Sequence, residues 1–244
     1  MLRGLSGDVS VCDSPDGLAE AAAARIQRAS ADACAARGSF SIALAGGSTP
    51  RTLYTLLSRP PFRAAIEWPL WDVFFGDERA VAPDDTSSNY RMARETLLDA
   101  VAIDPARVHR MPGDMPDLDL GADEYAIKLH GDLPEGPGHA PRLDCVLLGL
   151  GTNGHTASLF PHTHALEVQD RWVTRGRADE APYDRLTLTY PAINAAALVM
   201  FLVAGEPKRE ALKATASGAT PAARVRLVDG ELLWLLDADA AGTD

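Results

Sequence analysis

Almost unbroken apolar runs recur along the chain, and glycine or polar residues follow each of them. Such runs are typical of strands that are covered on both faces of a parallel sheet. The clearest of them lie at residues 40–45, 71–75, 144–148 and 198–203. Shorter or alternating patterns predict further strands at 9–12, 185–189 and 231–236, and we expect the last of these to close the sheet.

Helical segments lie between the predicted strands. An alanine-rich segment at 18–36 ends before Gly38, because glycine readily takes the left-handed conformation that ends a helix. Ser87 or Ser88 is expected to cap another helix that runs to about residue 100. Repeated strand–turn–helix units predict a layered α/β fold with a mainly parallel sheet. Further helices are predicted up to residue 57, at 121–130 and directly after 205–208.

Length and composition favour a single domain. The 244 residues are 46% hydrophobic, which is enough for a sizeable core, and they contain no internal repeat or long linker. We therefore expect residues 1–244 to form one domain, with 111–120 as the nearest approach to a boundary. The oligomeric state is left open, a monomer included.

Net charge and cysteine content limit the kinds of partner and the cellular compartment that we expect. The formal net charge of −11 disfavours nucleic acid and anionic membrane surfaces. Cys12, Cys34 and Cys145 form no paired or metal-like spacing, which suggests free thiols in a reducing compartment. The chain has no signal-peptide core and no apolar run of membrane-spanning length, so a cytoplasmic protein is expected.

The strand at 144–148 leads into a glycine-rich turn that presents His155. Ligands of parallel sheets bind outside the carboxyl ends of the strands, and a histidine placed there is a candidate acid or base. The turn also spells the G-x-G-x-x-G dinucleotide pattern, but Pro161 stops the long helix that such a site needs. A purely structural role for His155 is the other alternative.

The segment Gly46-Gly47-Ser48-Thr49-Pro50 lies between a strand and a helix and is typical of a phosphate-binding turn. Glycines allow close approach to a ligand, and a helix N-terminus offers backbone N–H groups and positive potential. We expect Ser48 or Thr49 to cap the helix and Pro50 to occupy its first position. No Gly-Lys-Ser/Thr follows, so this is not a Walker loop. An ordinary capped turn is the alternative.

Two further strand ends carry charged side chains. Asp77-Glu78-Arg79 follows the strand at 71–75, and Lys208 follows the strand at 198–203. Arginine binds phosphate or carbonyl oxygen, whereas the carboxylates can orient it, hold sugar hydroxyls or take a proton. Exposed surface positions are the alternative for both segments. Taken together, the four strand ends fit a phosphorylated sugar. His155, His162 and His164 define no metal-ligand geometry, so no metal site is predicted.

These segments, in this order and spacing from residue 40 to 208, resemble the 6-phosphogluconolactonase family. The most specific match is the string at 154–161, Gly-His-Thr-Ala-Ser-Leu-Phe-Pro, and Ser88-Asn89-Tyr90 belongs to the resemblance as well. The resemblance implies hydrolysis of 6-phosphoglucono-1,5-lactone in the pentose phosphate pathway without a metal or cofactor. It also implies a three-layer αβα sandwich with a Rossmann-like sheet, as in sugar-phosphate isomerases and deaminases. Where family members often have aspartate, this chain has Asn153.

Glucosamine-6-phosphate deaminases and sugar-phosphate isomerases share this framework and are the main alternative. The deaminase loop resembles Asp-Glu-Tyr where this chain has Arg79, and the deaminase string ends with an acid where this chain has Leu159-Phe160-Pro161. A non-catalytic sugar-phosphate sensor is a third possibility, but nothing basic flanks the domain, and a sensor has no need of His155.

The expected mechanism uses His155 as a general base that activates water for attack on the lactone carbonyl. Arg79 is a candidate for the carbonyl oxygen or for the phosphate. Ser158 lacks the elbow of a serine nucleophile, so an acyl-enzyme is not expected. The expected phosphate ligands are Gly46, Gly47, Ser48 and Thr49 with Lys208 or Arg51, while Asp77, Asn153 and Gly154 are expected to contact hydroxyls or orient neighbours.

Overall fold

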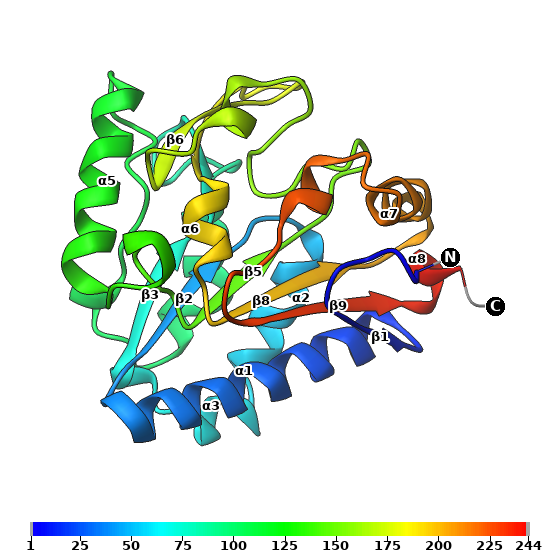
Figure 1. Ribbon diagram of the computed structural model, residues 1–244. Coiled ribbons are helices and arrows are strands. Elements are labelled where there is room, and N and C mark those ends of the chain that lie inside the picture. The colour runs from blue at the N-terminus through cyan, green and yellow to red at the C-terminus, as the bar shows by residue number, and fades with distance from the viewer. Residues whose placement is uncertain (1, 243–244) are drawn as a thin grey trace.

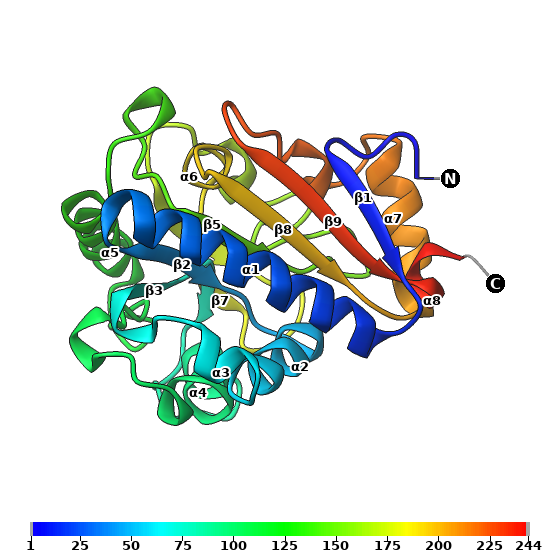
Figure 2. The ribbon, with the colours of Figure 1, turned by 90° about the horizontal axis from the view of Figure 1, so that it is seen from below.

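The computed structural model describes residues 2–242, and a six-stranded sheet lies at its centre (Figures 1 and 2). All neighbouring strands in this sheet run parallel, as the apolar runs predicted. The strand order is β1 (Asp8–Cys12), β9 (Glu231–Asp237), β8 (Leu198–Val203), β5 (Cys145–Leu148), β2 (Phe40–Leu44) and β3 (Trp71–Phe75).

One prediction about this sheet was wrong. Strand β9 does not close it, because β1 pairs alongside β9 and forms the edge. Strand β1 is largely exposed, whereas every residue of β2, β5 and β8 is buried. This exposure explains why the apolar pattern of β1 is the weakest of the six, since β3 at the other edge is almost wholly buried.

Helices cover both faces of the sheet and complete the three layers. Helix α1 (Pro15–Arg37) runs along one face, and α6 (Tyr190–Asn194) and α7 (Arg209–Ala216) lie on the other (Figure 1). Ser14 caps the start of α1, and Gly38 at φ 78° ends it as predicted. The remaining helices are α2 (Ser48–Leu57), α3 (Phe62–Ala65), α4 (Asn89–Thr96), α5 (Leu118–Asp132) and α8 (Ala238–Ala241).

A second, antiparallel sheet stands beyond the carboxyl end of β3. Its order is β4 (Asp77–Arg79), β7 (Asp184–Leu188) and β6 (Val173–Arg177). The sequence predicted Asp77-Glu78-Arg79 only as a charged segment after the strand at 71–75, so neither β4 nor β6 was predicted as a strand. Gly76 joins the two sheets, since its N–H donates to Leu44 O at 2.9 Å and its carbonyl accepts from Leu188 N at 2.9 Å.

The start of helix α2 also differs from prediction. Its N-cap is Gly47, at φ 105°, rather than Ser48 or Thr49, and Pro50 is the third helical residue. A residue with a side chain is strained at that φ, so the turn needs glycine before the helix begins. No helix among residues 2–242 is long and apolar enough to cross a membrane.

Candidate active site

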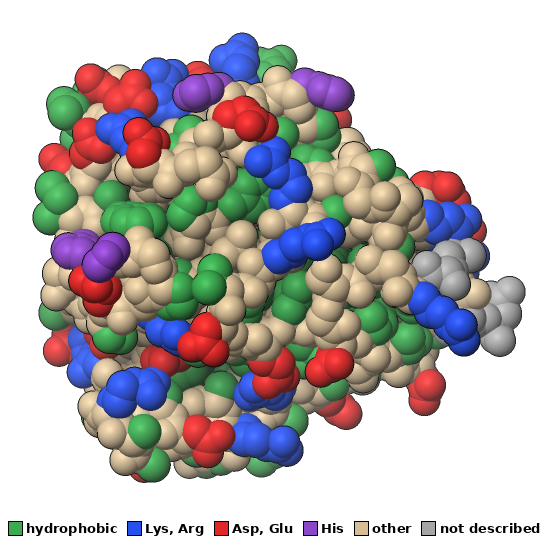
Figure 3. Space-filling view, in the orientation of Figure 1, with side chains coloured by type: hydrophobic (Ala, Val, Ile, Leu, Met, Phe, Trp, Pro, Cys, Tyr) green, Lys and Arg blue, Asp and Glu red, His purple; other side chains and the backbone are tan. Residues whose placement is uncertain are grey.

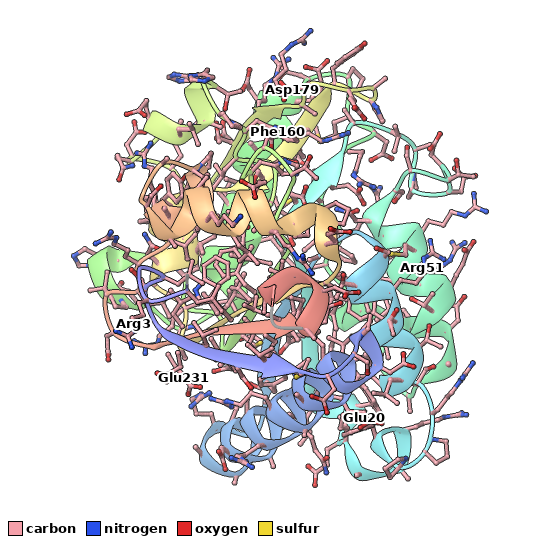
Figure 4. All side chains as sticks on the ribbon, turned by 90° about the vertical axis from the view of Figure 1, so that its right-hand side faces the viewer. Arg3, Glu20, Arg51, Phe160, Asp179 and Glu231 are labelled. Atoms are coloured by element: carbon pink, nitrogen blue, oxygen red, sulfur yellow. The ribbon has the colours of Figure 1, made fainter. Side chains whose placement is uncertain are left out.

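A cavity of about 450 Å³ opens at the carboxyl ends of β2, β5 and β8, with the second sheet as one wall. Most of the site residues predicted from the sequence line it together. Two do not: Gly154, and Arg51, which is exposed and lies well away from Phe160 and Asp179 in Figure 4. The predicted residues that line the cavity are Gly46, Gly47, Ser48, Thr49, Asp77, Arg79, Asn153, His155 and Lys208.

The glycine turn before α2 is held rigidly at the cavity floor. The Tyr54 hydroxyl donates to the carbonyl of Ala45 at 2.8 Å and accepts from the N–H of Ala45 at 2.9 Å. A Cβ on Gly46 would lie 1.9 Å from Asn89 Oδ1, so no other residue fits there. The first N–H groups of a helix have no partner within it, and those of Ser48 and Thr49 are therefore available to an anion.

The loop after β5 fixes the ring of His155. Gly151 N–H donates to the His155 carbonyl at 2.8 Å, and the imidazole stacks on Phe160 with 4.0 Å between ring centroids. A Cβ on Gly151 would lie 2.1 Å from His155 Nδ1, so the ring rests directly on the backbone. Gly154, at φ 80° and against Thr220, shapes the turn rather than the cavity.

Burial lowers the pKa of His155 to about 4; the charge of Asp77 opposes this shift, and that of Lys208 adds to it. Desolvation disfavours the charged imidazolium, so the ring is neutral at pH 7. A neutral imidazole has a free lone pair on one nitrogen. The site therefore holds a base in its reactive form.

Asn153 decides which ring nitrogen carries the hydrogen. Asn153 Nδ2 donates to Asp179 Oδ2 at 3.0 Å, and Asn153 Oδ1 lies 2.6 Å from His155 Nδ1. An ionised carboxylate only accepts, so the amide nitrogen must face Asp179 and the amide oxygen must face the imidazole. Nδ1 is then the donor, and Nε2 is the basic nitrogen.

The carboxylates of the Asp77-Glu78-Arg79 segment are occupied by the protein. Asp77 is buried and accepts from Ser158 Oγ at 2.6 Å and from Asn89 Nδ2 at 3.1 Å. This arrangement suits a positioning role better than proton transfer. The guanidinium of Arg79 lines the cavity and donates to the carbonyl of Ser87.

Glu78 supports a helix instead of contacting the cavity. Its carboxylate accepts from the N–H groups of Asn89 and Tyr90, each at 2.8 Å, and from the hydroxyl of Ser88 at 3.0 Å. These groups belong to the first turn of α4 and its N-cap. Glu78 therefore anchors α4, and with it the Asn89 side chain beneath the glycine turn.

Lys208 ends the short helical turn after β8, directly before α7. It is half-buried, burial lowers its pKa, and its ammonium makes no ion pair or hydrogen bond with another described residue. Its ammonium is thus available to a ligand. The expected position at a helix opening is confirmed, although α7 itself begins at Arg209.

Sequence reasoning missed several cavity residues as site components, namely Asn89, Phe160, Asp179 and Arg185. Phe160 and Asp179 lie near each other at the top of Figure 4, beside the histidine turn.

The structure also bears on two other kinds of site that the sequence raised, a dinucleotide site and a metal site. A turn rather than a long helix follows the G-x-G-x-x-G pattern, and no group of three potential metal ligands occurs among the described residues.

Comparison with known proteins gives one consistent family. A family model described as "Glucosamine-6-phosphate isomerases/6-phosphogluconolactonase" matches residues 13–234. A 6-phosphogluconolactonase of Synechocystis is 48% identical over 212 residues, which cover 85% of this chain and 86% of the relative. One of Streptomyces coelicolor is 41% identical, covering 92% and 89%. The solved 6-phosphogluconolactonase of Trypanosoma brucei has a TM-score of 0.87 and 31% identity, covering 98% of each chain.

Proposed function

The chain belongs to the family of glucosamine-6-phosphate isomerases and 6-phosphogluconolactonases, and on this premise we propose that it is a 6-phosphogluconolactonase. Its reaction is the hydrolysis of 6-phosphoglucono-1,5-lactone to 6-phosphogluconate, a step of the pentose phosphate pathway. The observation that carries this proposal is a neutral His155 that lines the same cavity as the glycine turn and has its Nδ1 engaged by Asn153.

In the proposed reaction, His155 Nε2 takes a proton from water as the water oxygen attacks the C1 carbonyl of the lactone. A C–O bond forms, and negative charge develops on the carbonyl oxygen. The intermediate then collapses, the bond from C1 to the ring oxygen breaks, and the imidazolium returns its proton to that oxygen. Asn153 accepts from Nδ1–H throughout and so keeps the ring in the productive tautomer.

The proposed phosphate site is the glycine turn. The free N–H groups of Ser48 and Thr49 face the cavity end of α2, and Gly46 and Gly47 allow the phosphate to approach the backbone. The unpartnered ammonium of Lys208 supplies a full positive charge to the same cavity. Arg51 is exposed and lies outside the cavity, so we assign the cation that binds the phosphate to Lys208 rather than to Arg51.

A direct assay tests the function. The purified protein is mixed with freshly made 6-phosphogluconolactone, and acid release at constant pH is followed against the spontaneous rate. We expect strong acceleration by the protein and about 10²–10⁴-fold slower turnover by His155→Gln. Glucosamine 6-phosphate, assayed for ammonia, is the control for the deaminase alternative. Ammonia release, or tight binding of the lactone without turnover, would overturn the proposal in favour of a deaminase or a sensor.

A further inference from the structure

Arg185 is a buried cation whose guanidinium makes no hydrogen bond or ion pair with any described residue. The charges of Asp77, Glu78 and Asp184 act on it only from beyond ion-pair distance. It lies on β7, is only 8% exposed and lines the cavity. Its Nη1 is fully buried without a hydrogen-bond partner, and the side chain makes no ion pair with any described residue. Burial, followed by the nearby charge of Arg79, lowers the pKa of its guanidinium.

Two other partly buried arginines have partners within the protein. Arg107, also partly buried, forms a two-pronged pair with Asp72, with Nη2 2.7 Å and Nε 3.0 Å from the carboxylate oxygens. Arg79 donates to a backbone carbonyl. Leaving a buried charge unpaired is strongly unfavourable in general. An arginine without an ion pair at a cavity wall therefore indicates that an anionic oxygen of the ligand binds to its guanidinium.

The second sheet directs Arg185 toward the histidine turn. In its ladder, Arg185 lies between Arg79 on β4 and Gly176 on β6. A Cβ on Gly176 would lie 2.6 Å from the Ser158 carbonyl and 3.3 Å from Arg185 Cβ, so glycine is needed for this close packing. Thr187, on the same face as Arg185, accepts from the N–H of Ser158 at 3.1 Å.

Ser158, against which this part of the second sheet packs, is three residues beyond His155. The charges of Lys208 and Arg185 both lower the pKa of that histidine, so the packing against Ser158, and not the pKa, places Arg185 beside it. Arg185 is thus at the end of the cavity where the histidine works. The proposed phosphate ligands, by contrast, come from the turn after β2 and from the segment after β8. The anionic ligand oxygen that contacts Arg185 is therefore the one that forms next to His155, and not an oxygen of the phosphate.

We propose that Arg185 is a catalytic residue that donates to the C1 carbonyl oxygen of the lactone and stabilises its negative charge during attack by water. In the product the same guanidinium holds the C1 carboxylate. This inference rests on the proposed lactonase function, and it gives the carbonyl role, which the sequence left open for Arg79, to a different arginine. A fixed cation at a developing oxyanion acts mainly on the transition state.

Kinetics of Arg185→Gln test the assignment. We expect kcat to fall by about 10²–10³-fold, as for loss of one oxyanion donor. We expect the KM and the competitive inhibition constant of inorganic phosphate to stay within a few-fold of wild type. Arg175→Gln, an exposed arginine on the adjacent strand β6 and outside the cavity, is the matched control with unchanged activity. A raised KM and phosphate inhibition constant with kcat retained would make Arg185 a phosphate ligand and overturn the proposal.

Thermal unfolding separates this role from a structural one. Arg185→Met removes an unpaired buried charge and keeps most of the volume, so its Tm should equal or exceed that of wild type. Arg185→Lys keeps the charge but loses the fork geometry and should recover only part of kcat. A large fall in the Tm of both variants would mean that Arg185 supports the fold, which contradicts the proposal.

A binding experiment distinguishes failure of this inference from failure of the proposed function. Calorimetry compares 6-phosphogluconate with sorbitol 6-phosphate, which has an alcohol in place of the C1 carboxylate. Wild type should prefer the carboxylate, and Arg185→Gln should lose that preference while it still binds sorbitol 6-phosphate. This result would support Arg185 even if the wild type failed to hydrolyse the lactone. Equal weakening of both ligands, or a preserved preference, would overturn the role of Arg185 alone.

Discussion

At the scale of single residues, the proposed chemistry depends on an imidazole that stays unprotonated. His155 has this property because burial lowers its pKa to about 4. Phe160 stacks on the ring, and the backbone of Gly151 lies against it. The ring is also held by the Asn153 oxygen, so a single residue has its protonation state, tautomer and orientation set by different neighbours.

The first prediction concerns pH. A general base works only when deprotonated, and the pKa of His155 is lowered, so kcat/KM should be level around neutrality and fall as the pH drops toward about 4. His155→Gln should lower kcat by about 10²–10⁴-fold and remove this acid limb. Stopped-flow assays in weakly buffered indicator solutions measure both. An acid limb near the ordinary histidine value of about 6.5 would contradict the assigned environment.

The second prediction uses the amide beside the ring. In Asn153→Asp a carboxylate faces His155 Nδ1, and an adjacent negative charge stabilises the imidazolium. The acid limb of kcat/KM should therefore move upward by about one pH unit or more. Asp179→Asn is the companion variant, because it releases the amide of Asn153 to flip without adding charge beside the ring. It should lower kcat, and because the charge of Asp179 raises the pKa of His155, its loss should move the limb slightly downward. An unchanged kcat would exclude the orienting role of Asp179.

The sequence predicted those site residues that follow strand ends, and it missed those that depend on tertiary packing. His155, Lys208 and the glycine turn each come directly after an apolar run, so their common edge follows from topology alone. Arg185 lies in an alternating strand, where a charged residue normally faces water. Its burial arises only when β7 packs against the histidine turn, 27 residues earlier in the chain at Ser158. No local signal marks Asp179.

At the scale of elements, helix α4 is tied to the site through Glu78. The third prediction is that Glu78→Gln destabilises the protein by about 1–3 kcal/mol, because an amide nitrogen cannot accept from the N–H groups that the carboxylate satisfies. Urea unfolding followed by circular dichroism measures the change. Glu95→Gln, on the exposed part of the same helix, is the control and should leave stability almost unchanged. Equal effects would rule out anchoring by Glu78.

The burial of each strand explains which elements could be predicted from the sequence. Strands β2, β3, β5 and β8 carry mostly apolar residues because they are covered by helices on both faces. Strand β4 is a three-residue charged segment, and β6 contains Gly176 between two exposed arginines, so neither has an apolar pattern. Their pairing is set by β7, which lies far away in sequence from β4.

At the scale of the whole molecule, the chain is interleaved rather than divided. Its first strand, β1, pairs with its last, β9, and β3 is joined through Gly76 to the second sheet. Figure 3 shows acidic and basic side chains interspersed over one face. This differs from the broad basic surface typical of nucleic-acid-binding proteins and accords with the formal net charge of −11. The cations that the proposal needs are instead confined to the cavity walls.

The last prediction follows from this interleaving. If the strands at one side of the sheet were removed, the buried strands at the other side would be exposed to water. Residues 1–244 should therefore unfold in one cooperative transition, as expected of a single domain. Trp71 on β3 and Trp234 on β9 report on opposite sides of the sheet. Trp71→Phe and Trp234→Phe should each give fluorescence and circular dichroism curves that coincide within that variant. Inorganic phosphate, by binding only the folded cavity, should raise the single midpoint. Separate midpoints for the two signals, with only one of them shifted by phosphate, would divide the chain into two domains.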